Sequence, residues 1–256
     1  MSSIHASIAA ALDEAARKAV AVSQFSSAGT PFSIEDAYRI QAMSIERRCQ
    51  RGERRIGIKL GFTSRAKMVQ MGVDSLIWGW LTNTMVEEDG GSVRLEKYIH
   101  PRAEPEICFL TKRDIDRPLT LLEVADHIEA VAPAIEIIDS RYEAFKFTLE
   151  DVVADNCSSA GVVVGPWSGK LDALANLGVV LRTDGRVVQT GSTAAILGHP
   201  LRSLVQASRV LAAAGTVLPA GSLIMAGAAT AAETMAHGNH VSATVGELGA
   251  ASFHVV

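Results

Sequence analysis

The 256-residue chain lacks the short motifs that mark the commonest nucleotide-binding and acyl-transfer sites. It contains no Gly-x-Gly-x-x-Gly, no phosphate-binding P-loop, no Gly-x-Ser-x-Gly and no His-Glu-x-x-His. No apolar run approaches the roughly 20 residues that a membrane helix needs, and the N-terminal segment lacks the hydrophobic region of a signal peptide. Basic residues form no block, and the formal net charge is −4. We therefore expect neither a nucleic acid nor a membrane as a partner.

Cysteine is also scarce, and its three residues, Cys49, Cys108 and Cys157, lie far apart. Their odd number and their spacing, which fits no zinc motif, favour reduced thiols over disulfides or a metal cluster. We therefore expect a cytoplasmic protein. Hydrophobic residues make up 48% of the chain and charged residues 20%, which is typical of a compact globular protein.

Apolar spacing predicts a mainly helical N-terminal part and a β-rich remainder. Helices are expected over 4–21, from a Ser33-x-x-Asp36 capping box to Gly52, over 64–72, over 120–131 and over 200–214. Strands are expected over 55–62, 134–138, 162–164, 179–182, 187–189, 223–225, 241–245 and 252–255, with a hairpin turn at 183–186. We expect an N-terminal helical lobe (1–54) and a β-rich catalytic domain (55–256), or one continuous domain.

Three glutamates are the strongest candidates for chemistry. Glu104 and Glu106 flank Pro105 in an extended segment, so their side chains leave the same face of a strand. Because proline cannot donate to the β-ladder, we expect this strand at a sheet edge or at a strand start. Glu136 lies between isoleucines, where an isolated carboxylate is costly. Three converging carboxylates would hold a divalent cation, and an all-oxygen site favours Mg²⁺ or Mn²⁺ over zinc.

Simpler explanations remain for each of these glutamates. The Glu-x-Glu pair is compatible with a solvated strand face. For Glu136 the alternative to a metal is an ion pair with Lys59 or Arg102.

Lys59 lies inside the strand at 55–62, between Gly57 and Gly61. The glycines would let an anionic ligand approach the lysine closely, although a lysine extending from a strand edge would give the same pattern. Arg65 could add a second cation there or be a surface residue. The small and polar residues of 155–159 indicate either a ligand-holding loop or a solvated turn.

Six segments spread over nearly the whole chain resemble the fumarylacetoacetate hydrolase superfamily, in its branch of hydratases and decarboxylases. They are Gly-Ile-Lys-Leu-Gly-Phe-Thr-Ser (57–64), Met-Gly-Val-Asp (71–74), His-Pro-Arg-Ala-Glu-Pro-Glu (100–106), Glu-Ile-Ile-Asp-Ser-Arg-Tyr (136–142), Ala-Asp-Asn-Cys-Ser-Ser (154–159) and Gly-Ser-Thr-Ala-Ala-Ile-Leu-Gly-His-Pro (191–200).

The resemblance implies an α+β fold, with a mixed β-roll core of the fumarylacetoacetate hydrolase C-terminal-domain type and an N-terminal helical lobe. It also implies a divalent cation, Mg²⁺ or Mn²⁺, on Glu104, Glu106 and Glu136, and an active-site role for Lys59. The substrate contacts that we predict are Leu60, Arg65, Asp155, Asn156, Ser158, Ser159 and Thr190.

One departure separates the two activities of the branch. The hydratases carry an acidic residue immediately before an aromatic-Gly pair, whereas here Ile77 precedes Trp78-Gly79. Hydration needs a group that activates or positions water, which isoleucine cannot do, and a dry pocket favours loss of CO2 from a poorly solvated carboxylate. Decarboxylation is therefore favoured over hydration.

The reaction expected is the metal-dependent conversion of 2-oxo-3-hexenedioate to 2-hydroxypenta-2,4-dienoate and CO2, in the meta-cleavage degradation of aromatic compounds. A hydratase acting on 2-hydroxypenta-2,4-dienoate, or a weakly active partner subunit of that hydratase, remains open. The resemblance also implies a small 2-oxo dicarboxylate as substrate, and a complex with the pathway hydratase, a homo-oligomer or both.

Overall fold

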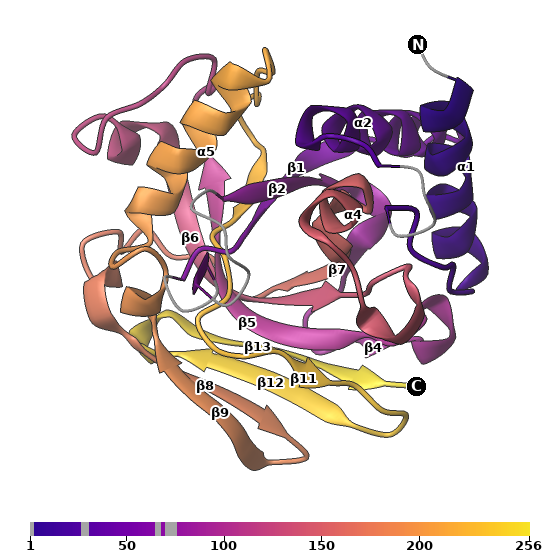
Figure 1. The fold of residues 1–256 in the computed structure, drawn as a ribbon. Coiled ribbons are helices and arrows are strands. Elements are labelled where there is room, and N and C mark those ends of the chain that lie inside the picture. The colour runs from indigo at the N-terminus through magenta and orange to yellow at the C-terminus, as the bar shows by residue number, and fades with distance from the viewer. Residues whose placement is uncertain (1–2, 27–30, 65–67, 70–75) are drawn as a thin grey trace.

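The computed structural model describes residues 3–26, 31–64, 68–69 and 76–256, which form two β-sheets with helices packed around them (Figure 1). The helices are α1 (Ser3–Lys18), α2 (Ile34–Gln50), α4 (Leu149–Ala154) and α5 (Leu201–Ala213). The strands are β1 (Arg55–Gly61), β2 (Ile77–Thr82), β3 (Val86–Glu87), β4 (Ser92–Val93), β5 (Arg102–Thr111), β6 (Ile128–Ile138), β7 (Ser159–Val164), β8 (Gly178–Thr183), β9 (Arg186–Ser192), β10 (Leu223–Met225), β11 (Glu233–Thr234), β12 (His240–Val245) and β13 (Gly249–Val255).

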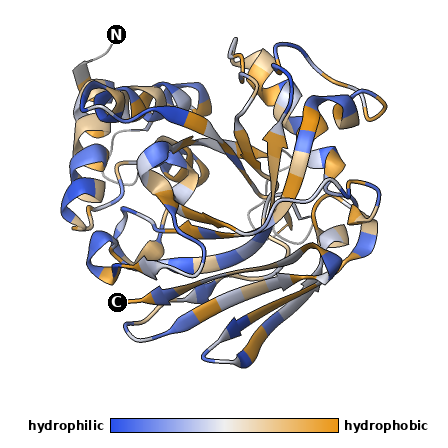
Figure 2. Ribbon diagram, turned by 180° about the vertical axis from the view of Figure 1, so that it is seen from behind, coloured by the Kyte–Doolittle hydropathy of each residue, from blue (hydrophilic) through white to orange (hydrophobic). Residues whose placement is uncertain are grey.

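The larger sheet has the order β2-β1-β10-β5-β6-β7-β3, and β11 pairs with the start of β5. The smaller sheet has the order β4-β13-β12-β8-β9. The two sheets pack face to face through buried apolar side chains, such as Ile135 and Val163 of the larger sheet and Val241 and Phe253 of the smaller one. Figure 2 shows hydrophobic residues along these strands and hydrophilic residues at the tip of the β8–β9 hairpin.

The N-terminal helix α2 packs against α4 and contacts β2, the end strand of the larger sheet. Ser33 caps α2 in a complete capping box with Asp36, as its sequence predicts. Gln41, on the buried face of α2, donates hydrogen bonds of 3.1 Å to the Trp78 carbonyl and 2.9 Å to the Val153 carbonyl. We propose that residues 1–54 form a helical lobe attached to the domain of residues 55–256.

Most of the predicted elements are confirmed, including the strand at Arg55–Gly61, the helix at Leu201–Ala213 and the hairpin at 183–186. Asp184 and Gly185 both have positive φ, 53° and 76°, as a two-residue hairpin turn requires. The predicted helix over 64–72 and Arg65 lie largely outside the described residues.

Two predictions are wrong. The segment 120–131 is not an α-helix: a turn and a 3-10 helix (Val124–His127) lead directly into β6, which begins at Ile128. The strand β5 is not at an edge but in the middle of the larger sheet, between β10 and β6. Pro105 is accommodated because β10 pairs with residues 108–110 and β11 with residues 102–103, which leaves the proline between the two ladders.

Candidate metal centre

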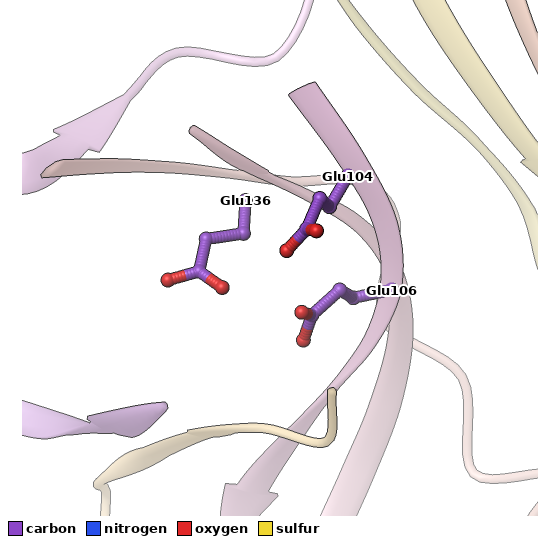
Figure 3. Close-up of side chains that lie close together, drawn as sticks. All are labelled: Glu104, Glu106 and Glu136. Atoms are coloured by element: carbon purple, nitrogen blue, oxygen red, sulfur yellow. The ribbon is translucent and has the colours of Figure 1, made fainter. Parts of the chain in front are cut away.

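The glutamates come together because β5 and β6 are antiparallel neighbours. Glu104 lies directly opposite Glu136 in the register of the two strands, and Glu106 lies two residues along the same face of β5. One ligand atom from each carboxylate lies within 4.8 Å of the others. Figure 3 shows the three carboxylates pointing toward one another. The alternation of the two strands therefore produces a cluster of three acidic groups.

These carboxylates are removed from solvent: Glu106 is 1% exposed and Glu136 0%. Burial and the charges of Glu136 and Glu104 raise the pKa of Glu106 well above its usual value. Burial also raises the pKa of Glu136, although Lys59 opposes the shift. Negative charge is therefore disfavoured in this cluster unless a cation compensates for it.

Lys59 supplies one positive charge from the neighbouring part of the sheet. Its Nζ lies 3.2 Å from both carboxylate oxygens of Glu136, and its side chain is 5% exposed. Burial favours the neutral lysine, but the nearby carboxylates outweigh burial and raise the pKa of Lys59. The ion pair with Lys59 that the sequence left open for Glu136 is thus present, and it balances one of the three carboxylates.

Two oxygens of the cluster show that its hydrogen bonding is incomplete. Oε2 of Glu106 accepts a hydrogen bond of 2.8 Å from the Gly227 backbone N–H. Among the described residues, Oε1 of Glu106 is buried without a hydrogen-bond partner, and Oε1 of Glu136 lies 3.2 Å from the Lys59 Nζ but makes no well-aligned hydrogen bond. Buried carboxylate oxygens without partners are costly, and a divalent cation with oxygen ligands would satisfy them. The donor set therefore fits Mg²⁺.

A cavity leads to this cluster, and we call it the glutamate cavity. Its described lining residues are Lys59, Leu60, Gly61, Phe62, Thr63, Ser64, Ile77, Arg102, Glu104, Ile138, Phe145, Phe147, Val152, Cys157, Ser158, Ala228, Thr230 and Ala232. Two cations, Lys59 and Arg102, and the Glu104 carboxylate thus lie among mainly apolar lining residues. Such a cavity suits a small anionic ligand whose chain is apolar.

The predicted substrate contacts fall into two groups. Leu60 and Ser158 line the glutamate cavity, and the Ser158 hydroxyl is buried without a hydrogen-bond partner among the described residues. Thr190 is exposed on β9 of the smaller sheet, and the structure does not bring it to this cavity. Arg65 lies outside the described residues.

The remaining three contacts, Asp155, Asn156 and Ser159, are buried beside the cavity rather than in its wall. Asp155 accepts hydrogen bonds from the backbone N–H and the guanidinium of Arg141. The side-chain oxygen of Asn156 accepts from the Trp80 N–H at 2.7 Å, and its amide donates to the Trp80 carbonyl at 2.9 Å. These side chains fix the segment that presents Ser158.

The backbone of this segment is unusual, because three consecutive residues have left-handed φ values. They are 49° at Asn156, 52° at Cys157 and 59° at Ser158. Such angles are rare outside glycine and persist only where surrounding contacts hold them. Gly79 of β2 lets this segment pack closely against the strand, since a Cβ at residue 79 would lie 2.5 Å from the Asn156 carbonyl oxygen.

The Asp155–Arg141 pair leads to a prediction about stability. Burial raises the pKa of Asp155 to about 6, although Arg141 opposes that shift. Asp155→Asn would leave the Arg141 guanidinium buried without an anion, and we expect a loss of about 3 kcal/mol in the free energy of unfolding. Denaturant unfolding monitored by circular dichroism measures it. Glu247→Gln, which breaks an exposed pair with Lys170, is the control and should change stability little. Equal stability of Asp155→Asn and the unchanged protein would contradict this role.

Sequence reasoning missed Gly227 and Phe145 as parts of this site and did not assign Arg102 to the substrate. Gly227 has φ +106°, and a Cβ there would lie 2.0 Å from the Thr63 hydroxyl oxygen. Its contribution is a backbone N–H, which no side-chain pattern reveals. Arg102 precedes Glu104 by two residues, so the same alternation that paired the glutamates could have placed it on their face.

Comparisons with known proteins agree on a family for this chain. The family described as fumarylacetoacetate (FAA) hydrolase C-terminal matches residues 56–256. A 4-oxalocrotonate decarboxylase from Pseudomonas sp is 51% identical over 246 residues, which are 96% of this chain and 96% of that protein. A 2-hydroxypent-2,4-dienoate hydratase from Pseudomonas putida is 38% identical, over 74% of this chain and 87% of that protein.

A solved structure shows a similar fold. It is a 4-oxalocrotonate decarboxylase from Pseudomonas putida G7, complexed with magnesium and adipate. The TM-score is 0.95 at 37% identity, and the match covers 99% of this chain and 97% of that one. Together with the family match, it confirms the predicted α+β fold with its curled sheet and N-terminal helices.

Proposed function

Because the chain belongs to the fumarylacetoacetate hydrolase family, and within it to the 4-oxalocrotonate decarboxylases, we propose that it converts 2-oxo-3-hexenedioate to 2-hydroxypenta-2,4-dienoate and CO2. The chain is a carboxy-lyase, and its cofactor is magnesium. The observation that carries the proposal is the glutamate triad beside Lys59, in a cavity whose wall at Ile77 is apolar. The proposed reaction belongs to the meta-cleavage degradation of aromatic compounds.

The substrate itself explains why a site of this kind suffices. The carboxylate that is lost is attached to C5, the saturated carbon next to the C3–C4 double bond, and that double bond is conjugated to the 2-oxo group. When the C5–C6 bond breaks, its electron pair moves through the conjugated chain to the 2-oxo oxygen, and CO2 leaves. Mg²⁺ held by Glu104, Glu106 and Glu136 would supply a Lewis acid that stabilises negative charge on that oxygen.

The chain's own residues then have distinct tasks. The Lys59 ammonium, buried 3.2 Å from Glu136, holds a positive charge beside the 2-oxo oxygen and donates the proton that this oxygen takes up. The Ser158 hydroxyl, which has no hydrogen-bond partner in the described part of the chain, orients the 1-carboxylate by donating a hydrogen bond.

Ile77 keeps the cavity dry. Its side chain is 5% exposed and lines the cavity with Phe147 and Val152. Because water is excluded, hydration does not stabilise the departing carboxylate, which favours its loss as CO2. The same exclusion leaves no water in place to add to the dienol product.

One assay tests the reaction against hydration, which the 38% identity to a hydratase keeps as the second candidate. The purified chain is incubated with Mg²⁺ and 2-oxo-3-hexenedioate, and CO2 release and the absorbance of the dienol are followed together. We expect CO2 with accumulation of the dienol. Consumption of added 2-hydroxypenta-2,4-dienoate, with no CO2 from the dicarboxylate, would assign hydration. Turnover that persists in excess EDTA would contradict the metal dependence.

The raised pKa of Glu106 predicts that metal affinity depends on pH. Without the cation, Glu106 keeps a proton at pH values where an ordinary glutamate is ionised, and binding of Mg²⁺ must displace it. Apparent affinity should therefore rise with pH, by about tenfold per unit for each proton released, until Glu106 is ionised in the free protein. Calorimetric titrations with Mg²⁺ at several pH values, in two buffers of different ionisation enthalpy, measure the affinity and the proton release. An affinity independent of pH would contradict a protonated Glu106.

We also propose a complex with the hydratase of the next step, self-association or both, and a cytoplasmic location. The location is supported by the three cysteines, which are free thiols. No described helix is long and apolar enough to cross a membrane. Size-exclusion chromatography with multi-angle light scattering, with and without the hydratase, tests both associations.

A further inference from the structure

Arg102 occupies the position on β5 that precedes the metal ligands on the same face. Residues 102, 104 and 106 alternate with Ala103 and Pro105, so their side chains leave one side of the strand. Arg102 and Glu104 both line the glutamate cavity. One face of β5 therefore presents the Arg102 guanidinium, followed by Glu104 and Glu106, two of the three glutamates of the proposed metal site.

The Arg102 guanidinium has no carboxylate partner within 4.0 Å among the residues that the structure describes. Lys59, the other described cation in the cavity wall, is already paired with Glu136. Arg102 is half-buried, and its guanidinium carbon lies 4.2 Å from the centre of the Phe145 ring. A guanidinium stacked on an aromatic face keeps its N–H groups available at the edge of the plane.

Phe145 is itself held in place. Its φ is 57°, and its ring packs against the rings of His100, at 5.2 Å between centroids, and Phe147, at 5.8 Å. A left-handed backbone and two ring contacts restrict where the phenyl group can lie. The guanidinium is therefore positioned before any ligand arrives.

The spacing along β5 matches the length of the proposed substrate. Two residues along a strand span about 6.7 Å. Four carbon–carbon bonds of roughly 1.5 Å in an extended zigzag carry the chain about 5 Å from C2 to C6, and the carboxylate oxygens reach further. A molecule whose 2-oxo acid end lies at the glutamates can therefore place its far carboxylate at Arg102.

We propose that Arg102, held by Phe145, binds the distal carboxylate of the substrate and makes the site selective for 2-oxo dicarboxylates over 2-oxo monocarboxylates. This inference rests on the proposed function, which it deepens by assigning the second carboxylate to a residue. A guanidinium pairs with a carboxylate through two parallel N–H donors, which fixes the carboxylate's plane as well as its position. The direction of the C5–C6 bond is thereby fixed relative to the conjugated chain.

The expected kinetic signature follows from the charge of the carboxylate. An ion pair stabilises the ionised carboxylate that is later lost, so Arg102 acts in binding and selection rather than in breaking the bond. Arg102→Met should raise KM for 2-oxo-3-hexenedioate by roughly 10- to 100-fold, with a smaller effect on kcat.

The decisive measurement uses binding instead of turnover. Calorimetry on the Mg²⁺-loaded protein compares 2-oxoadipate with 2-oxohexanoate, which differ in the distal carboxylate. Neither has the C3–C4 double bond, so neither can lose CO2 by the proposed route. We expect Arg102→Met to weaken 2-oxoadipate roughly 10- to 100-fold and to leave 2-oxohexanoate within about threefold. Lys146→Met, which removes an exposed lysine beside Phe145 that does not line the cavity, should change neither ligand.

A second variant tests the same contact without altering β5. Phe145→Leu releases the guanidinium from the ring, and it should weaken binding of 2-oxoadipate more than binding of 2-oxohexanoate. Equal losses for both ligands in both variants, or no loss for either, would overturn the proposal. These outcomes are independent of the CO2 assay, so a failure of the proposed reaction and a failure of this contact are distinguishable.

Discussion

Glu106→Gln is expected to abolish Mg²⁺ binding and to lower CO2 release by roughly 10³-fold or more. Glu106 is 1% exposed, and one of its oxygens has no hydrogen-bond partner among the described residues. The substitution replaces an anionic ligand by a neutral amide, whose NH2 group cannot coordinate a cation. Isothermal titration with Mg²⁺ and a CO2-release assay measure the two effects.

The stability of the metal-free protein separates this effect from misfolding. Burial and the charges of Glu136 and Glu104 raise the pKa of Glu106, so the metal-free site disfavours an ionised carboxylate there and accepts a neutral amide at little cost. The metal-free Glu106→Gln protein should therefore unfold at the same temperature as the unchanged protein or above it, while losing the increase that Mg²⁺ gives the latter. Glu129→Gln, an exposed substitution on β6, should retain full activity. Normal Mg²⁺-dependent turnover in Glu106→Gln would exclude it as a ligand.

Lys59→Met is expected to lower kcat by roughly 10²- to 10⁴-fold while Mg²⁺ affinity is retained. Methionine fills much of the same space but brings neither charge nor proton. The lysine pairs with Glu136 and is not one of the three carboxylates, so its loss leaves the carboxylate set in place. Single-turnover kinetics and Mg²⁺ titration separate the two quantities.

The same substitution should also make the metal-free protein less stable. The three buried carboxylates lose the ammonium that balances Glu136, and Mg²⁺ should restore most of the lost stability. Lys112→Met, at an exposed lysine near Glu129, is the matched control and should leave kcat and stability nearly unchanged. A kcat of Lys59→Met near that of the unchanged protein would remove Lys59 from the mechanism.

The sequence predicted the glutamate cluster because part of its geometry is local. Alternation along an extended segment is enough to place Glu104 and Glu106 on one face. The position of Glu136 opposite Glu104 depends instead on the register of β5 and β6, which are separated by a long connection. No local pattern encodes that register, so convergence on Glu136 was a hypothesis until the strand pairing was known.

The helix predicted at 120–131 is wrong because a capping pattern and helical apolar spacing were outweighed by strand pairing. Thr120 and Glu123 do form hydrogen bonds, in which the backbone N–H and the hydroxyl of Thr120 both donate to the Glu123 carboxylate. That bonding closes a turn but does not start an α-helix. Ile128 and Val131 are β-branched and buried in β6, where pairing with β5 outweighs the helical spacing of the apolar residues.

The segment 155–159 shows a different limit. Its small and polar residues indicated either a ligand-holding loop or a solvated turn, and polarity alone does not say which side chains face a ligand. Asp155 pairs with Arg141, and Asn156 accepts a hydrogen bond from the Trp80 N–H. Both partners come from other segments of the chain, so the local sequence does not reveal these contacts. Whether a polar side chain serves the fold or the ligand was decided by tertiary contacts that the sequence does not display.

The hydrogen bonds of Gln41 limit how far the β-rich part of the chain can be separated from its N-terminal helices. The family match begins at residue 56, so α2 lies outside it, yet the Gln41 amide bridges the Trp78 and Val153 carbonyls beside the segment that carries Ser158. A chain cut at residue 55 would keep Lys59 and every glutamate of the triad, but two carbonyls next to the site would lose their shared donor. The N-terminal helices therefore support the active site, and grafting the β-rich part alone onto another protein would separate the reacting groups from part of that support.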